Sequence, residues 1–401
     1  MTELEYQNLA CALSALTVFR GVLKQPPMEA LLRYLRNTEG ERTGMELYGA
    51  FVYALAEDDY SLSAFLKRAV LTDENACARA AARRKGREIE ISSALRDNMN
   101  AELQLFSRLT RLTPEDLCTP PTYQGYIPKF ENEPVDFASA YAVHLTNIRR
   151  VGYGIFASAT MFRVDDGGSI VPIRTADAVT QDRFVGYDEQ RGQVFENTRA
   201  LMQGKRAANI LLYGDAGTGK SSTVKAVANY YAKEGLRLIE LRKDQLFALP
   251  RVMGAISDNP LKFIVFIDDL SFNSNDDSFS MLKAALEGSA AAKAENAVIY
   301  ATSNRRHIIK ESFSDRDAGD DVHRRDTMQE LVSLSDRFGL TVYFPRPGKA
   351  EYLEIVRTLA RRAGLKIERP ELEQRAEAFA LARGSRSPRA AEQFITQLKA
   401  E

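Results

Sequence analysis

The sequence predicts an α/β protein in which a parallel sheet, with helices on both faces, follows a helical N-terminal region and precedes a small helical C-terminal region. Apolar residues three and four positions apart recur through roughly the first 160 residues, which is the spacing of amphipathic helices. From residue 207 onward short β-rich runs alternate with helical segments, and after FPRP the helical spacing returns. Together these three observations predict the fold class.

The N-terminal region, residues 1–160, is predicted to be a helical domain. Apolar positions within 9–23 follow helical spacing, and QPP at 25–27 ends that helix because proline cannot continue it. One long polar helix is expected over 74–109; its basic run RRKGR is explained better by a solvated helix face than by a contact patch, since EIE follows directly. The Pro-rich stretch 119–134 is expected to be a connector or docking loop.

The sheet is predicted to lie in an α/β nucleotide-binding domain, residues 181–347, with a hairpin around DDGG and a linker at 161–180 before it. Five strands are expected, and the segments between the first four have the length that parallel crossovers need. Residues 348–401 are predicted to form a small C-terminal helical lid. The five expected strands are NILLYG (209–214), LRLIEL (236–241), FIVFID (263–268), AVIYATS (297–303) and LTVYFP (340–345).

Composition sets few limits on partners. With 54 basic and 54 acidic residues the net charge is zero, so no overall field draws the chain to nucleic acid or to a membrane. The three cysteines are far apart and fit neither a disulfide framework nor a zinc site, which favours a reducing compartment. The N-terminus lacks the pattern of a signal peptide, and no run approaches the ~18 apolar residues of a membrane span. A cytoplasmic location with no membrane partner is therefore expected.

The segment GDAGTGKSS matches the pattern GxxxxGK(S/T) and lies between a predicted strand and a predicted helix. Small residues let backbone N–H groups surround a phosphate, and the N-terminus of the following helix adds the positive end of its dipole. Lys220 would reach the β- and γ-phosphates of ATP, and Ser221 would ligate Mg²⁺. An ordinary glycine-rich turn is the alternative, but this context favours a five-stranded parallel P-loop NTPase sheet. The expected nucleotide-binding residues here are Gly214, Asp215, Ala216, Gly217, Thr218, Gly219, Lys220, Ser221 and Ser222.

Two adjacent carboxylates, Asp268 and Asp269, close the apolar run in FIVFIDDLSF. Asp268 would hold Mg²⁺, directly or through water, and Asp269 would lie near the γ-phosphate, where a base polarises the attacking water. Asn304, after the next strand, would help to orient that water. The alternative is a buried strand whose polar end faces solvent, but the place of this strand after the phosphate-binding segment favours the catalytic interpretation.

Five segments occur in the motif order of AAA+ ATPases: GDAGTGKSS, FIDDL, YATSN, LSDRFGL and SPRAAEQF correspond to Walker A, Walker B, sensor 1, arginine finger and sensor 2. Residues 180–401 therefore resemble the AAA+ ATPases, and most closely an uncharacterised bacterial AAA+ family with a helical N-terminal half. The resemblance implies that Asn304 is sensor 1 and that Arg389 is sensor 2, which reaches the γ-phosphate from the lid.

The same resemblance implies that Arg337 is an arginine finger that acts in trans on ATP held by a neighbouring subunit, and hence that the protein is a homo-oligomer. It also implies that Val185 and Gly186, in RFVGYDEQ, line the adenine pocket. Each arginine has a structural alternative. Arg337 could simply pair with Asp336 or other nearby acids, and Arg389 is one of several lid arginines, with Arg383 and Arg386 close by.

Two features depart from the usual AAA+ pattern. Asp269 stands where most AAA+ ATPases have Glu, and a side chain one methylene shorter would slow the reaction, since a misplacement of ~1 Å can cost ~10²-fold in rate. The stretch 311–329 is long and highly charged, which is typical of a solvated loop and less often of a partner surface. The stretch KDQLFALPRV has no obvious aromatic–Gly pore loop, so substrate threading is unsupported.

The leading hypothesis is an AAA+ ATPase that binds Mg-ATP and hydrolyses it slowly to ADP and phosphate, gated by assembly, to drive conformational change in a protein assembly with an unknown client. An ATP-gated switch or scaffold with negligible turnover is the second hypothesis, and Asp269 favours it. A loader or remodeller acting on DNA is the third: Lys205, Arg206, Arg305 and Arg306 would offer phosphate contacts, but zero net charge does not indicate nucleic acid. The expected catalytic residues are Lys220, Asp269, Asn304, Arg337 and Arg389.

Overall fold

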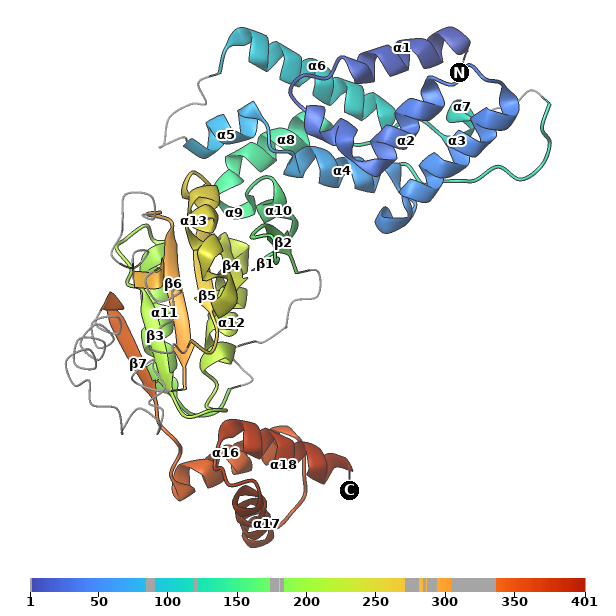
Figure 1. Ribbon diagram of the computed structural model, residues 1–401. Coiled ribbons are helices and arrows are strands. Elements are labelled where there is room, and N and C mark those ends of the chain that lie inside the picture. Colours follow the sequence, from blue (N-terminus) through green and yellow to red (C-terminus); the bar gives the residue numbers. More distant parts are fainter. Residues whose placement is uncertain are drawn as a thin grey trace, which may run out of the picture. The chain divides into compact units, whose positions relative to one another are not determined.

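The chain folds into two compact units, Met1–Ser158 and Ala159–Glu401, and each unit has a hydrophobic core of its own. The computed structural model (Figure 1) describes residues 2–83, 91–118, 122–173, 180, 184–270, 281–283, 286, 294–304 and 337–400. Among these residues no helix is both long and apolar enough to cross a membrane.

The described elements of the first unit are helices. An aromatic core joins them: Phe19 packs edge-on against Phe106 and Tyr141. The helices are α1 (Glu3–Ser14), η1 (Arg20–Lys24), α2 (Pro26–Leu35), α3 (Glu41–Ala54), η2 (Ala56–Asp58), α4 (Leu62–Thr72), α5 (Ala76–Arg83), α6 (Ser93–Leu109), α7 (Pro114–Leu117), α8 (Phe137–Thr146), α9 (Ile148–Val151) and α10 (Ile155–Ser158).

The prediction of one continuous helix over 74–109 is wrong at its centre. Ser92 has an extended backbone, and its side chain accepts a hydrogen bond from the backbone N–H of Leu95, so it begins α6 as an N-cap. Helices α5 and α6 lie within the predicted range, but the serine inside this polar run is a capping residue at which a new helix starts. Most of the basic run RRKGR, from residue 84 to residue 87, lies outside the described residues.

The second unit is built on one sheet whose strands lie in the order β2-β1-β4-β5-β6-β3-β7 (Figure 1). All neighbouring strands are parallel except β1 and β2, which form an antiparallel hairpin. The strand carrying the phosphate-binding segment, β3, therefore lies between β6 and β7. The strands are β1 (Met161–Val164), β2 (Ile170–Pro172), β3 (Ile210–Gly214), β4 (Leu236–Leu241), β5 (Lys262–Ile267), β6 (Ala297–Ser303) and β7 (Leu340–Phe344).

The prediction of five strands is wrong because the hairpin β1–β2 joins the sheet. Its first strand pairs in parallel with β4, so β4 is not an edge strand. The local signal around DDGG predicts the hairpin, but no local pattern states which strand a hairpin will pair with. The parallel α/β architecture itself is confirmed.

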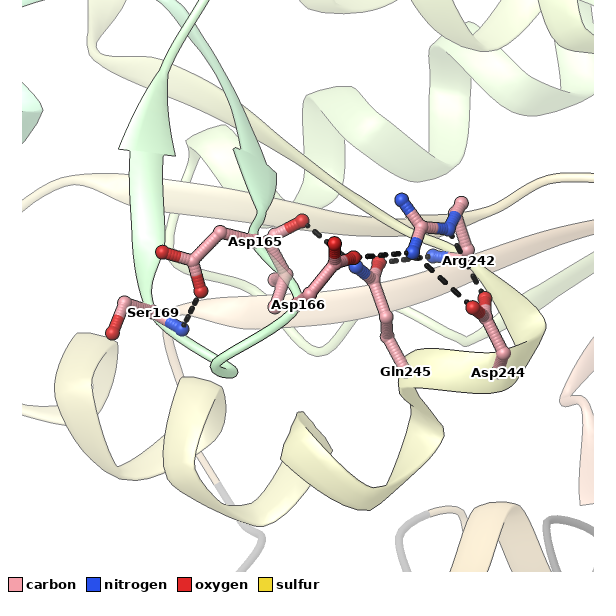
Figure 2. Close-up of polar contacts among 7 residues, drawn as sticks. Asp165, Asp166, Ser169, Arg242, Asp244 and Gln245 are labelled. Atoms are coloured by element: carbon pink, nitrogen blue, oxygen red, sulfur yellow. Dashed lines mark hydrogen bonds and ion pairs between the residues drawn. The ribbon is translucent and has the colours of Figure 1, made fainter.

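Polar contacts tie the hairpin to the segment that follows β4, as Figure 2 shows. Arg242 forms ion pairs with Asp166 of the hairpin turn at 2.8 Å and with Asp244 at 3.1 Å. The side-chain amide of Gln245 donates to the carbonyl of Val164, at the end of β1. These contacts hold the turn of the hairpin against η5 (Lys243–Ala248), which forms the first part of the stretch KDQLFALPRV.

Helices cover the two faces of the sheet. On one face α11 (Asp188–Met202) and α12 (Lys220–Tyr231, followed by η4, Ala232–Glu234) share a core with alternate residues of β3. Helix α13 (Leu249–Ser257) contacts β6 and is held there by Asn296, whose side-chain amide donates to the carbonyl of Ile256 at 2.8 Å. Three C-terminal helices, α16 (Lys349–Arg362), α17 (Arg369–Ala382) and α18 (Pro388–Ala400), have a separate small core.

Candidate nucleotide-binding site

The segment between β3 and α12 has a backbone that its glycines alone can adopt comfortably. Gly214 has φ 137°, and a Cβ atom there would lie 2.0 Å from the carbonyl oxygen of Phe344 in β7. At Gly217, with φ 77°, a Cβ would lie 3.1 Å from the hydroxyl of Ser387, just before α18. The segment is thus a tight loop in close contact with both the sheet and the C-terminal helices.

Lys220, the first residue of α12, is buried at the base of this loop. Its ammonium group donates to the carbonyls of Gly214 at 2.7 Å and Asp215 at 2.8 Å, and to Oδ1 of Asn304 at 3.1 Å. Burial lowers the pKa of Lys220, and nearby carboxylates, Asp215 first among them, oppose that shift. The amine is therefore held by neutral acceptors that an anionic phosphate could replace.

The side chains of Ser221 and Asp268 meet at the carboxyl end of the sheet. The hydroxyl of Ser221 donates to Oδ1 of Asp268 at 2.6 Å, and the hydroxyl of Thr302 donates to the same oxygen at 2.5 Å. Within the described residues no group of three or more His, Cys, Asp and Glu side chains could hold a metal ion. A hydroxyl and a carboxylate side by side nevertheless suit Mg²⁺, which takes oxygen ligands and usually relies on one or two carboxylates plus substrate phosphates.

Asp269 has an unusual backbone. Its φ of 53° lies in the left-handed region, which is sparsely occupied by residues other than glycine and most accessible to Asn and Asp. Its backbone N–H donates to the hydroxyl of Thr302 at 2.9 Å, and its Oδ1 accepts from the side-chain amide of Asn304 at 2.8 Å. Both Asp269 and Asn304 are exposed to solvent.

A pocket adjoins the phosphate-binding loop within the second unit. It is lined by the loop, by residues before and within α11, and by α16 and α18. Val185 lines it and packs against the core of the C-terminal helices, whereas Gly186 does not line it but lies beside Ile355, which does. Residues that the sequence did not single out also line the pocket, notably Tyr187, Ile355 and Leu359.

Of Arg383, Arg386 and Arg389, the structure brings only Arg389 to this pocket. Its backbone N–H donates to the carbonyl of Gly217 at 3.3 Å, and its side chain is among the lining groups. Arg383 instead lies over the ring of Phe379, with its guanidinium carbon 5.4 Å from the ring centroid. Arg386 forms an ion pair with Glu377 at 3.0 Å.

Arg337 is half-buried and lies shortly before β7. Its proposed pairing partner, Asp336, lies outside the described residues, as do Arg305, Arg306 and the charged stretch 311–329. The assignment of Arg337 as an arginine finger therefore stays a prediction.

Thr302 is the residue of this cluster whose contacts the sequence did not predict. In the sequence it is one of the polar residues that end the strand AVIYATS, yet its hydroxyl contacts both residues of the carboxylate pair. The one available signal was a hydroxyl residue at the end of the otherwise apolar run AVIYA. That signal is weak because polar residues often end strands.

The chain is similar to several known proteins. It is 48% identical over 50 residues to ORC1-type DNA replication protein 14 from Haloarcula marismortui, a match that spans 12% of this chain and 12% of that relative. A RuvB mutant from Thermotoga maritima matches with 16% identity and a TM-score of 0.39, over 55% of this chain and 65% of that chain. AMPPCP-bound DnaA from Aquifex aeolicus matches with 16% identity and a TM-score of 0.38, over 57% and 67%.

Residues 157–401, more than half of the chain, match the family described as "Protein of unknown function (DUF815)". The match includes the phosphate-binding loop, the carboxylate pair and the C-terminal helices. The chain belongs to this DUF815 family.

Proposed function

We propose that the protein binds Mg-ATP and hydrolyses it slowly to ADP and phosphate, gated by assembly, to drive conformational change in a protein assembly. One observation carries this proposal. Hydrogen bonds join five side chains at the phosphate-binding loop, which come from α12 and from the ends of β5 and β6: Lys220, Ser221, Asp268, Asp269 and Asn304. That set offers a cation, two hard oxygen ligands, a base and an amide in one place.

In this proposal the chain's own groups do most of the catalytic work by position and charge. Lys220 would exchange its contacts with Asn304 and the loop carbonyls for phosphate oxygens. Asn304, released from the amine, would keep its contact with Asp269, and the two side chains would orient the attacking water. Asp269 would accept the proton of that water as it attacks the γ-phosphate.

Ser221 and Asp268 would hold Mg²⁺, because their oxygens already lie 2.6 Å apart at the end of the loop. When bound, the ion would neutralise charge on the phosphate oxygens. Val185, Tyr187 and Leu359 would provide apolar and aromatic surface for the adenine ring of ATP. Arg389 would approach the γ-phosphate from the C-terminal helices.

Two features of the proposal concern rate. Asp269 is shorter than Glu, so its carboxylate reaches less far, and turnover is expected to be slow. Arg337 would act on ATP held by a neighbouring copy, and since an arginine finger can be worth ~10³-fold or more, assembly would control turnover.

The test is phosphate release measured over a wide range of protein concentration. Activity per molecule should rise with concentration as copies assemble. Lys220→Ala should reduce it about 10²-fold or more, because the ammonium group that offsets phosphate charge is lost. Lys225→Ala is the matched control: Lys225 lies on the same helix but pairs with Glu240, at 2.9 Å, so turnover should persist. Equal phosphate release by wild type and Lys220→Ala would refute the ATPase proposal.

A nucleotide-gated switch is the second candidate, and the left-handed backbone of Asp269 is the observation that favours it, since a strained residue at the base position would suit tight binding without turnover. Single-turnover measurements with excess protein separate the two candidates. Nucleotide binding with no phosphate release at any protein concentration would select the switch.

A role on DNA is a third candidate, which the 50-residue match to an ORC1-type DNA replication protein favours. Lys205 and Arg206, before β3, are exposed and would be available for phosphate contacts. A mobility assay at increasing salt should then show binding that weakens steeply as counterions compete.

A further inference from the structure

Thr302 occupies a central place in the site although it is almost fully buried in β6, with 2% of its surface exposed. Its hydroxyl donates to the carboxylate of Asp268 at 2.5 Å and accepts from the backbone N–H of Asp269 at 2.9 Å. Its carbonyl accepts from the backbone N–H of Leu270 at 2.7 Å. One residue of β6 therefore fixes three consecutive residues after β5.

The hydroxyl of Thr302 would keep Asp268 in place when nucleotide enters. In the structure Ser221 and Thr302 both donate to Oδ1 of Asp268. On binding Mg²⁺ the oxygen of Ser221 would become a metal ligand, so its position would depend on the ion as well as on Asp268. Thr302 cannot leave, since it is buried in the sheet, so its hydrogen bond would still orient the carboxylate.

The same hydroxyl also holds the left-handed turn at Asp269. The hydrogen bond from the Asp269 N–H to Thr302 fixes the peptide that begins this turn. In that conformation the Asp269 carboxylate contacts the amide of Asn304 at 2.8 Å. Asp enters the left-handed region more readily than Glu, whose side chain cannot hydrogen-bond locally in the same way. The turn therefore gives a physical reason for Asp at this position.

We propose that Thr302 is a positioning residue that sets the geometry of both carboxylates, Asp268 for the metal ion and Asp269 for the water. This inference rests on the proposed function. Thr302 touches neither nucleotide nor metal in this proposal. It acts through the two aspartates, so its loss should affect turnover and the requirement for Mg²⁺ more than the affinity for nucleotide.

The experiment compares Thr302→Val, which keeps the shape but lacks the hydroxyl, with Thr302→Ser, which keeps the hydroxyl. Thr302→Val should lower kcat about 10²-fold while KM for ATP changes less than about 3-fold, as expected for a misplaced base and a lost transition-state contact. It should also raise the Mg²⁺ concentration needed for half-maximal binding of a fluorescent ATP analogue. Thr302→Ser should restore both properties to within about 3-fold of wild type.

Thr198→Val is the matched control for the cost to the fold. Thr198 is also fully buried in this unit, and its hydroxyl contacts the carbonyl of Val194 and the hydroxyl of Tyr300, both at 2.8 Å. It lies in α11 and contacts neither aspartate, so Thr198→Val should lower the melting temperature but leave kcat and the Mg²⁺ requirement unchanged.

The outcomes separate this inference from the proposed function. If wild type hydrolyses ATP and Thr302→Val does so equally well, the inference is wrong and the function stands. If wild type releases no more phosphate than Lys220→Ala, the function is wrong, and the Mg²⁺ titration alone decides the inference. An unchanged Mg²⁺ requirement in Thr302→Val, or the same losses in Thr198→Val, would overturn the positioning role.

Discussion

Two carboxylates, one in each unit, accept several hydrogen bonds and yet differ in purpose. Glu102 in α6 is 8% exposed and accepts from the backbone N–H groups of Thr17, Val18 and Phe19, with distances between 2.7 and 3.1 Å. Asp268 is exposed at the end of β5, and both of its hydroxyl donors reach a single oxygen, Oδ1.

The two carboxylates differ in the groups that donate to them and in their access to solvent. Both oxygens of Glu102 accept from backbone N–H groups, so this carboxylate holds the chain between α1 and η1 in place. Asp268 accepts from two side-chain hydroxyl groups, both at Oδ1, and it lies at the solvent-exposed carboxyl end of the sheet beside the phosphate-binding loop. The number of hydrogen bonds to an acid therefore says little about its function; the kind of donor and the access of solvent say more.

Among the variants that test this difference between Asp268 and Glu102, Asp268→Asn should have the largest effect. The variant keeps an acceptor for Thr302 and Ser221 but removes the negative charge that Mg²⁺ requires, so turnover should fall about 10²-fold or more. Melting temperature without nucleotide should stay within a few degrees of wild type, because an exposed charge contributes little to the fold. Phosphate release measures the loss of turnover, and thermal melting measures the stability of the fold. A large loss of stability would show that Asp268 serves the fold as Glu102 does.

Glu102→Ala is the reciprocal change and should act on stability alone. It would leave the backbone N–H groups of the buried residues Val18 and Phe19, and that of the exposed Thr17, without their acceptor, at a cost of about 3 kcal/mol or more to the free energy of unfolding. Glu102→Gln, which retains one acceptor oxygen, should cost less. Circular dichroism during thermal melting measures both, with Glu46→Ala, an exposed residue of α3, as the control. Loss of nucleotide binding in the still-folded variant would contradict the division of roles.

The parts of the molecule that the sequence predicted are those with local signals. The phosphate-binding loop has a fixed spacing of glycines before Lys220, and each strand around it is a short apolar run bounded by polar residues. The adjacent pair Asp268 and Asp269 follows the second strand after that loop. The order of the segments alone therefore predicts that the pair lies at the carboxyl ends of the parallel strands.

The parts that the sequence did not predict depend on pairing between distant segments. Hairpin β1–β2 joins β4 across more than sixty residues of chain, and no local pattern encodes that choice. The reach of Thr302 to both aspartates depends on the register of β6 against β5. Likewise, only tertiary contacts separate Arg389, which lines the pocket, from Arg386, which pairs with Glu377.

The smallest expected effect concerns a third acid, Asp73, which follows α4 near Glu102. Burial, and then the negative charges of Glu74 and Glu102, raise the pKa of Asp73 to about 6, although its hydrogen bond from Asn75 and the charge of Arg79 act in the opposite direction. An acid whose pKa is higher in the folded state than in the unfolded state binds its proton more tightly when folded. Its stabilising contribution is therefore fully present below the unfolded pKa of 3.8 and is lost as the pH rises through about 6.

Asp73→Asn should remove this loss, since the amide keeps the shape of the side chain and does not ionise. Relative to wild type, the variant should gain stability between pH 4 and pH 7, by at most about 1–2 kcal/mol because Asp73 is only partly buried and solvent screens its charge. Melting temperatures of both proteins at several pH values measure the difference, and Asp97→Asn, an exposed aspartate of α6, makes the same change in charge without the burial. If wild type and Asp73→Asn keep a constant difference across this range, then Asp73 does not titrate with folding, and this prediction is wrong.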